Sequence, residues 1–268
     1  MYPYDIVPGV SLYVILICVG IIACFVTFSK LSYKRKLSAR VHNLALLCGM
    51  LGIVAGLGSA VLFQALYNIA SLGGFEINKS TGATFYGGLI GGAAIFLAVY
   101  FTVGGIKNKD KKHLEEFFPL LSCIAPSIAI AHGFGRIGCL TAGCCHGDLT
   151  DSWLGIMMHG NHGYAKYVPT QLFEAIFLLL LCALLVTMAI ERKKYVFSTY
   201  TVAYGVWRFI IEYVRADYRG ESFISFLTPS QIAAVGFILA GIMLGVIEYV
   251  SAKKHASMAE SIKESADE

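Results

Sequence analysis

Residues 171–190 read QLFEAIFLLLLCALLVTMAI, an apolar run that contains a single charged side chain, Glu174. A helix of about 20 apolar residues is long enough to cross the hydrocarbon core of a membrane, which is roughly 30 Å thick. This stretch is therefore predicted to be a transmembrane helix, and it decides the class of fold.

Similar apolar runs recur along the chain. Of its 268 residues, 57% are hydrophobic and 14% are charged, against roughly 45–50% and about 25% in an average soluble domain. This composition argues against a soluble enzyme and against a nucleic-acid-binding protein. It predicts an all-α, polytopic membrane protein with about seven transmembrane helices. The expected spans are residues 10–28, 44–66, 85–103, 118–134, 171–190, 200–214 and 228–250.

Basic residues gather in the segments that follow alternate spans. Most of the 21 Lys and Arg residues lie near Lys34, Lys109, Lys193 and Lys253. Cytoplasmic loops carry an excess of Lys and Arg, so this asymmetry predicts an N-out, C-in orientation. We expect residues 1–252 to form a single transmembrane domain and residues 253–268 to form a cytoplasmic tail.

Ionisable side chains interrupt the sixth span. Tyr204, Arg208, Glu212 and Arg215 follow one another at spacings that place them on one face of a helix. Ionisable groups at membrane depth are costly and usually face a partner or a watery cavity. Glu212 can pair with either arginine, which leaves the other guanidinium for an anion such as a phosphate. The alternative is a purely structural ion pair within the helix bundle.

A second polar segment follows the fourth span. Residues 132–147 read HGFGRIGCLTAGCCHG and contain His132, Arg136 and His146. Glycine is unfavourable inside a helix and allows close approach of the backbone to a ligand. Irregular backbone at membrane depth is tolerated where it lines a cavity. We therefore predict a loop that dips into the site rather than a regular helix.

The three cysteines of this segment, Cys139, Cys144 and Cys145, have three interpretations. With His146 they offer metal ligands, although adjacent cysteines lack the usual spacing of zinc sites. Cys139 can form a disulfide with Cys144 or Cys145 on the outer, oxidising side. They can also be reactive or simply small packing residues near Arg136, whose charge would lower a thiol pKa. We favour the last interpretation and expect no metal and no other cofactor.

Four motifs now point to one family. They are FYGGLIG at residues 85–91, GRIG at residues 135–138, PTQLFE at residues 169–174, and Tyr204-Gly-x-x-Arg208-Phe-x-x-Glu212-x-x-Arg215. In these motifs, in their order along the chain, and in the number and orientation of the expected spans, the sequence resembles the prolipoprotein diacylglyceryl transferase family.

The resemblance implies a transferase in the bacterial cytoplasmic membrane, with its active site toward the outer face. Such an enzyme takes the diacylglyceryl group of phosphatidylglycerol and passes it to the lipobox cysteine thiol of a prolipoprotein, with release of glycerol phosphate. The implied partners are therefore a phospholipid and an acceptor protein. Arg136 and Arg208 match the essential arginines of the family. We expect substrate contacts at Tyr86, Cys139, Cys144, Gln171, Glu174, Tyr204, Glu212 and Arg215.

Several positions depart from the family pattern. Cys139 and Ala142 stand where the family has asparagines, Cys144 stands where it has a glutamate, and Tyr86 and Val168 stand where it has histidines. The general base of the family is therefore not obvious in this chain. His132 and His146 are candidate replacements because imidazole titrates near neutral pH, and Glu174 is an alternative.

These departures leave two classes of function open. The first is a divergent enzyme that uses phosphatidylglycerol but modifies a different acceptor. The second is a non-catalytic protein that binds lipid or prolipoprotein, or a thiol-redox protein on the same fold.

Overall fold

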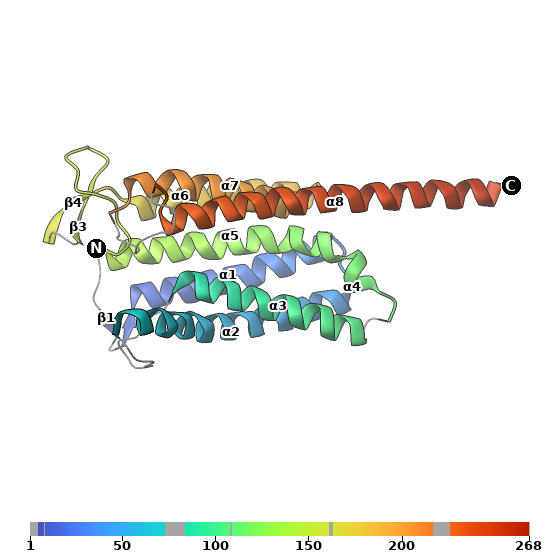
Figure 1. Ribbon diagram of the computed structural model, residues 1–268, viewed down its shortest axis with the longest axis horizontal. Coiled ribbons are helices and arrows are strands. Elements are labelled where there is room, and N and C mark those ends of the chain that lie inside the picture. Colours follow the sequence, from blue (N-terminus) through green and yellow to red (C-terminus); the bar gives the residue numbers. More distant parts are fainter. Residues whose placement is uncertain are drawn as a thin grey trace. The chain divides into compact units, whose positions relative to one another are not determined.

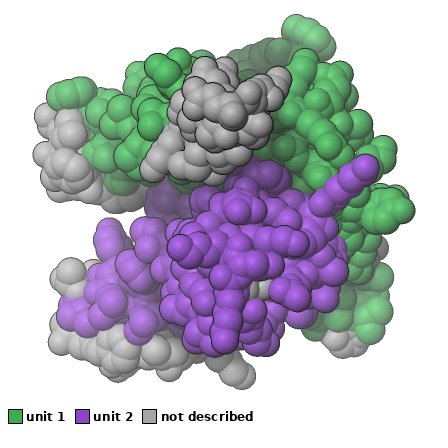
Figure 2. Space-filling model, turned by 90° about the vertical axis from the view of Figure 1, so that its right-hand side faces the viewer, with its two compact units in different colours: residues 1–35, 121–268 green, residues 36–120 purple. Residues whose placement is uncertain are grey.

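The computed structural model describes residues 5–7, 9–72, 84–107, 109–160, 163–216 and 226–267, without the side chains of residues 5, 70–72, 85 and 254–267. The chain forms two compact units. Unit 1 comprises residues 1–35 and 121–268, and unit 2 comprises residues 36–120. Figure 2 distinguishes the two units by colour.

Unit 1 contains most of the long helices. These are α1 (Leu12–Lys34), α6 (Thr170–Ile190), α7 (Val196–Ile211), α8 (Pro229–Asp267) and all but the first turn of α5 (Phe117–Ala142). A 3₁₀ turn, η1 (Glu212–Val214), continues α7. Two small antiparallel hairpins pair β1 (Asp5–Val7) with β2 (Val10–Ser11) and β3 (Ile156–Gly160) with β4 (Gly163–Tyr167). In Figure 1 the β3–β4 hairpin lies at the end of unit 1 where α5 ends and α6 begins.

Unit 2 is built on two helices, α2 (Ala39–Leu72) and α3 (Phe85–Lys107), followed by the single turn of α4 (Lys112–Glu115). Glycines bring α2 and α3 close together. A Cβ atom at Gly92 would lie 2.9 Å from the carbonyl oxygen of Gly52, and one at Gly88 would lie 3.1 Å from that of Gly56. Small residues at such spacings let helix backbones approach in a membrane.

The helices confirm an all-α, polytopic membrane protein. Within the described part of the chain, six helices are long and apolar enough to cross a membrane: α1, α2, α3, α5, α6 and α8. Many of their large apolar side chains are exposed, such as those of Ile22, Val54 and Leu239. Lipid is the environment that accommodates such a surface. A helix also stands at the predicted sixth span, but α7 has only 16 residues, so the count of seven and the orientation stay predictions.

The apolar core of unit 1 lies between α5, α6 and α7. It comprises Ala125, Ala129, Leu178, Leu181, Cys182, Leu185, Val196, Tyr200 and Tyr204. The largest group comes from one face of α6, where Leu178, Leu181 and Leu185 recur at helical spacing and are almost completely buried. This packing fixes α6 and α7, the two helices that continue into the polar site.

The predicted loop over residues 132–147 is wrong for most of its length. Helix α5 continues through His132 and Arg136 to Ala142. Each glycine inside a helix lowers its stability by about 1 kcal/mol relative to alanine. Here, however, the absence of a side chain lets residues from other helices pack closely against α5. A Cβ atom at Gly138 would lie 3.1 Å from the Tyr13 ring, and one at Gly133 would lie 3.1 Å from Leu179. The helix ends only at Gly143, whose φ of +73° suits glycine.

Residues 148–167, which precede α6, carry no sequence pattern that predicts their structure. In the structure the strands β3 and β4 occupy residues 156–160 and 163–167, with Met158 opposite Ala165. The chain leading into the hairpin runs beside β4, since Leu149 forms a bridge with Tyr167. The tail expected over residues 253–268 is a continuation of α8 as far as Asp267, and its side chains from residue 254 lie outside the described part.

Candidate active site

Glu174 is the centre of a buried polar cluster in unit 1. Its side chain is completely buried in the second turn of α6. One oxygen, Oε2, lies 3.0 Å from Nε of Arg136 and 3.9 Å from Nη1 of Arg215. The other, Oε1, accepts a hydrogen bond of 3.1 Å from the Tyr204 hydroxyl and lies 3.8 Å from Nε2 of His132. One carboxylate therefore joins side chains from α5, α6, α7 and the segment after η1.

Glu212 is the second carboxylate of the cluster. Its Oε2 lies 2.8 Å from Nη2 of Arg208 and 4.0 Å from Nε of Arg215. The Thr228 hydroxyl donates a hydrogen bond of 3.1 Å to its Oε1. Nη2 of Arg208 also donates to the hydroxyl of Ser230 at 3.0 Å. These contacts fix Arg208 between the end of α7 and the beginning of α8.

The cluster has more positive than negative charge. Three guanidinium groups, those of Arg136, Arg208 and Arg215, surround the two carboxylates of Glu174 and Glu212. The exposed fractions of the five side chains lie between 0% and 12%. An uncompensated charge at membrane depth is unfavourable. A bound anion would balance the excess.

Arg208 also has donor capacity left. Its Nη1 atom is buried and has no hydrogen-bond partner among the described residues. A buried N–H group without a partner costs about 1–3 kcal/mol, and more when the group is charged. Guanidinium groups match phosphate oxygens in geometry as well as in charge. A phosphate-like anion would therefore suit the charge and the remaining donor of this cluster.

Local helical geometry explains this arrangement. His132 and Arg136 are separated by four residues, as are Tyr204 and Arg208, so each pair shares one helix face. The predicted helical stripe on the sixth span is present only for Tyr204 and Arg208, since α7 ends at Ile211 and Glu212 lies in η1. The side chains of all four predicted residues are buried. After η1 the backbone of Arg215 becomes extended and forms a bridge with Gly147.

The structure places His132 and His146 differently. His132 lies in the cluster, and its ring is 5.0 Å from that of Tyr204, edge to face. His146 is buried beside the hairpin, where its Nδ1 is 2.8 Å from the Gly147 carbonyl and its ring is 4.3 Å from that of Tyr167. Among the described contacts, those of His132 link it to the arginines through Glu174, whereas those of His146 do not.

Two residues at the start of α6 hold the loop that follows α5. The hydroxyl of Thr170 donates to the carbonyl of Cys145 at 2.8 Å, and Nε2 of Gln171 donates to the carbonyl of Cys144 at 2.8 Å. Gln171 is completely buried. Its described contacts position the loop, and its predicted contact with substrate stays a prediction.

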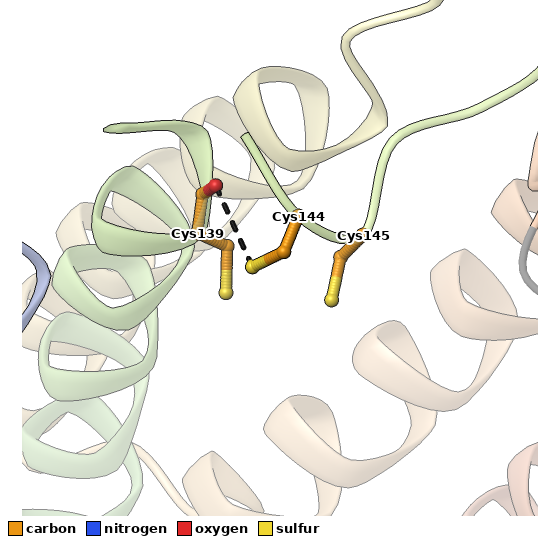
Figure 3. Close-up of side chains that lie close together, drawn as sticks. All are labelled: Cys139, Cys144 and Cys145. Atoms are coloured by element: carbon orange, nitrogen blue, oxygen red, sulfur yellow. Dashed lines mark hydrogen bonds between the residues drawn. The ribbon is translucent and has the colours of Figure 1, made fainter. Parts of the chain in front are cut away.

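The three cysteines of the motif lie together, as Figure 3 shows. Their Sγ atoms are all within 4.8 Å of one another, and none of the three forms a disulfide. Hydrogen bonds from the Cys139 and Cys144 thiols lower the pKa of Cys145 below its ordinary value. The charges of Arg215 and Arg136 lower it further, while burial opposes this shift.

The predicted site residue Tyr86 lies in unit 2, at the beginning of α3, and is half-buried. Its predicted contact with substrate stays a prediction.

Sequence reasoning missed Thr228 and Ser230. The backbone N–H of Gln231 donates to the hydroxyl of Thr228, and the N–H of Thr228 donates to Oε1 of Gln231. This is the capping box that a threonine and a glutamine three residues later predict, with Pro229 at the first helical position. The motif TPSQ at residues 228–231 thus carried a readable signal for the helix start, but nothing in it pointed to Glu212 or Arg208.

Comparison with known proteins agrees with the motifs. The family model for prolipoprotein diacylglyceryl transferase matches residues 5–247. A protein of Clostridium tetani named phosphatidylglycerol–prolipoprotein diacylglyceryl transferase is 34% identical over 238 residues, which is 85% of this chain and 89% of that protein. A second protein of that name, numbered 2, from Clostridium perfringens is 34% identical over 65% of this chain and 65% of its own length. The protein of that name from Finegoldia magna is 29% identical over 87% of this chain and 89% of its own length. The chain therefore belongs to the prolipoprotein diacylglyceryl transferase family.

Proposed function

We propose that this protein transfers the diacylglyceryl group of phosphatidylglycerol to the cysteine thiol of a prolipoprotein and releases glycerol phosphate. The observation that carries the proposal is the buried excess of positive charge around Glu174 and Glu212, since the lipid donor brings a phosphate. The names of the relatives supply the donor and the acceptor. The protein acts in the bacterial cytoplasmic membrane, in an N-out, C-in orientation and with its site toward the outer face.

Arg208 and Arg136 hold the phosphate of the lipid. The acceptor thiolate attacks the glycerol carbon that carries the phosphate ester on the diacylglyceryl side. A C–S bond forms, the C–O bond breaks, and the phosphate oxygen leaves with the bonding electrons. Charge grows on that oxygen in the transition state, so guanidinium groups fixed in advance stabilise the transition state more than the substrate.

His132 takes the proton of the acceptor thiol. It is the histidine of the polar cluster, with a side chain that is 15% exposed, and its Nε2 lies 3.8 Å from Glu174. Glu174 serves to orient the ring and to hold Arg136 and Arg215. In this arrangement His132 and Arg136 are held by the same carboxylate, while Glu212 holds Arg208, so the base lies beside one arginine of the phosphate clamp.

The proposal is tested with the full chain in detergent micelles that contain phosphatidylglycerol and a synthetic peptide with a lipobox cysteine. We expect mass spectrometry to find the peptide heavier by one diacylglyceryl group and glycerol phosphate in equal amount. The same peptide with serine in place of the cysteine is the control and should stay unmodified. Consumption of the lipid without a modified peptide would contradict the proposed acceptor, and an unchanged lipid would contradict the proposed reaction.

A further inference from the structure

The loop after α5 brings three thiols to one point. Cys139 belongs to the last turns of α5, and Cys144 and Cys145 follow that helix directly. The three Sγ atoms lie within 4.8 Å of one another and point into one small space, as Figure 3 shows. None of the other described His, Cys, Asp or Glu side chains forms a cluster of three or more at such distances.

The backbone explains how adjacent cysteines reach the same point. In an extended chain, neighbouring side chains point in opposite directions. Here Cys145 has a φ of +62° and Gly143 a φ of +73°, and this turn leaves the Sγ atoms of Cys144 and Cys145 within 4.8 Å of that of Cys139. The N–H of Cys144 donates to the carbonyl of Cys139 at 3.2 Å. The unusual spacing of the motif is therefore no obstacle to a shared ligand.

We propose that Cys139, Cys144 and Cys145 together bind one thiophilic metal ion of the Zn²⁺ class. Zinc binds thiolates at about 2.3 Å, so sulfur atoms around one tetrahedral ion are roughly 3.8 Å apart. Three sulfurs within 4.8 Å of one another come close to this arrangement before any ion is bound. Thiolate ligands select Zn²⁺ and similar soft ions over Mg²⁺ or Ca²⁺, which require oxygen ligands.

A disulfide explains the cluster less well. A disulfide joins two sulfurs at about 2.05 Å and would leave the third thiol of the cluster without a role.

The ion would keep one open position. His146 follows Cys145 directly, but its Nδ1 lies 2.8 Å from the Gly147 carbonyl and its ring packs against Tyr167. Its contacts direct it away from the three sulfurs. Three protein ligands with a fourth position for water or another thiol are typical of reactive zinc sites, whereas structural sites have four protein ligands. Cys144 is exposed at the surface of the protein.

The test uses the full chain, purified in detergent under reducing conditions and loaded with Cd²⁺ or Zn²⁺ before desalting. We expect one equivalent of metal per chain and, with Cd²⁺, the ultraviolet charge-transfer absorption of thiolate ligands. Each of C139S, C144S and C145S should weaken binding by at least about tenfold. The control is C24S, which removes a thiol from the middle of α1 and should bind metal as the parent protein does.

A second measurement needs no variant. Zn²⁺ should protect the thiols of Cys139, Cys144 and Cys145 from maleimide, as peptide mass spectrometry can show residue by residue, and should leave the labelling of Cys18 unchanged. Equal labelling of the three cysteines with and without Zn²⁺ would overturn the proposal. Metal binding that persists in the variant lacking all three thiols would overturn it too, and so would a disulfide between two of them that forms in air while Zn²⁺ is present.

Discussion

Glu174 shows how a single side chain can organise a membrane site. It is completely buried, and it contacts two arginines, a histidine and a tyrosine. A helix-start glutamate reads as an ordinary residue in the sequence, because the arginines that it meets come from positions 38 residues before it and 41 residues after it (Arg136 and Arg215). Its central position could be found only once the helices were packed.

The charge of Glu174 is expected to hold the cluster together. Glu174→Gln removes the carboxylate that pairs with Arg136 and one of the two carboxylates near Arg215, and breaking a buried ion pair in this way costs about 3–5 kcal/mol. Thermal unfolding in detergent should show a clearly lower midpoint. The matched control is Glu191→Gln, which removes an exposed pair with Lys193 and should change stability by less than about 1 kcal/mol. Equal midpoints for the two variants would contradict this account.

The Tyr204 hydroxyl is expected to contribute through its bond to Glu174. Tyr204→Phe removes that donor and keeps the ring, and hydrogen bonds to charged groups are worth about 1.5–3 kcal/mol. Tyr213→Phe, at a side chain that is 70% exposed, is the control for the same chemical change. A Tyr204→Phe protein that unfolds at the temperature of the Tyr213→Phe protein would show that the bond adds nothing.

At the scale of elements, the sequence predicted the positions of the helices much better than the residues at which they end. Each of the seven expected spans overlaps a helix, since hydropathy depends on composition over many residues. The end of α5 was missed, because five glycines in residues 132–147 suggested a loop. Gly133 and Gly138 instead lie where neighbouring side chains pack closely against the helix. Propensity is local, whereas this packing depends on residues far away in the chain.

The approach of α2 to α3 is expected to depend on glycine. Gly92→Ala places a Cβ atom 2.9 Å from the Gly52 carbonyl oxygen, and such overpacking costs about 1–3 kcal/mol. Gly58→Ala adds the same atom to α2 where nothing lies within 4 Å, so it should leave stability unchanged or raise it slightly. Thermal unfolding of the two variants compares these effects, and a Gly92→Ala protein as stable as the Gly58→Ala protein would refute the close approach.

The Thr228 hydroxyl is expected to stabilise both the start of α8 and the side chain of Glu212. Thr228→Ala removes the cap of the helix and the hydroxyl that donates to Glu212. Loss of a cap alone costs about 0.5–2 kcal/mol. Thr228→Ser keeps both interactions and is the control. Chemical denaturation should place the serine protein near the parent and the alanine protein below it, and the reverse order would contradict the assignment.

At the scale of the whole molecule, the basic residues fall into two groups, those expected in loops on one side of the membrane and those buried in the polar cluster. Most basic residues would lie on the cytoplasmic side in the predicted orientation, and three of the remaining arginines form the buried cluster. The order of the motifs identified the family, and the structure shows which residues of those motifs meet in unit 1. The sequence alone left open whether His132 or His146 joins the arginines, because both histidines flank the same segment.

The predicted orientation is tested by accessibility. Single cysteines introduced at Lys109 and at Asp151, in a cysteine-free background, should react differently with a membrane-impermeant maleimide added to intact cells. The N-out, C-in arrangement predicts labelling at position 151 and protection at position 109. The opposite pattern would reverse the orientation.

The central claim is that Arg136 and Arg208 hold the lipid phosphate while it becomes the leaving group. It is tested most directly by the rate of diacylglyceryl transfer from phosphatidylglycerol to a lipobox peptide, measured for R136A, R208A and the control R192A, which changes an exposed arginine after α6. Loss of one donor to a developing negative charge lowers turnover by about 10²–10³. We predict that loss for R136A and R208A, with turnover expressed per folded molecule, and parent-like turnover for R192A. Parent-like turnover in either R136A or R208A would contradict the account.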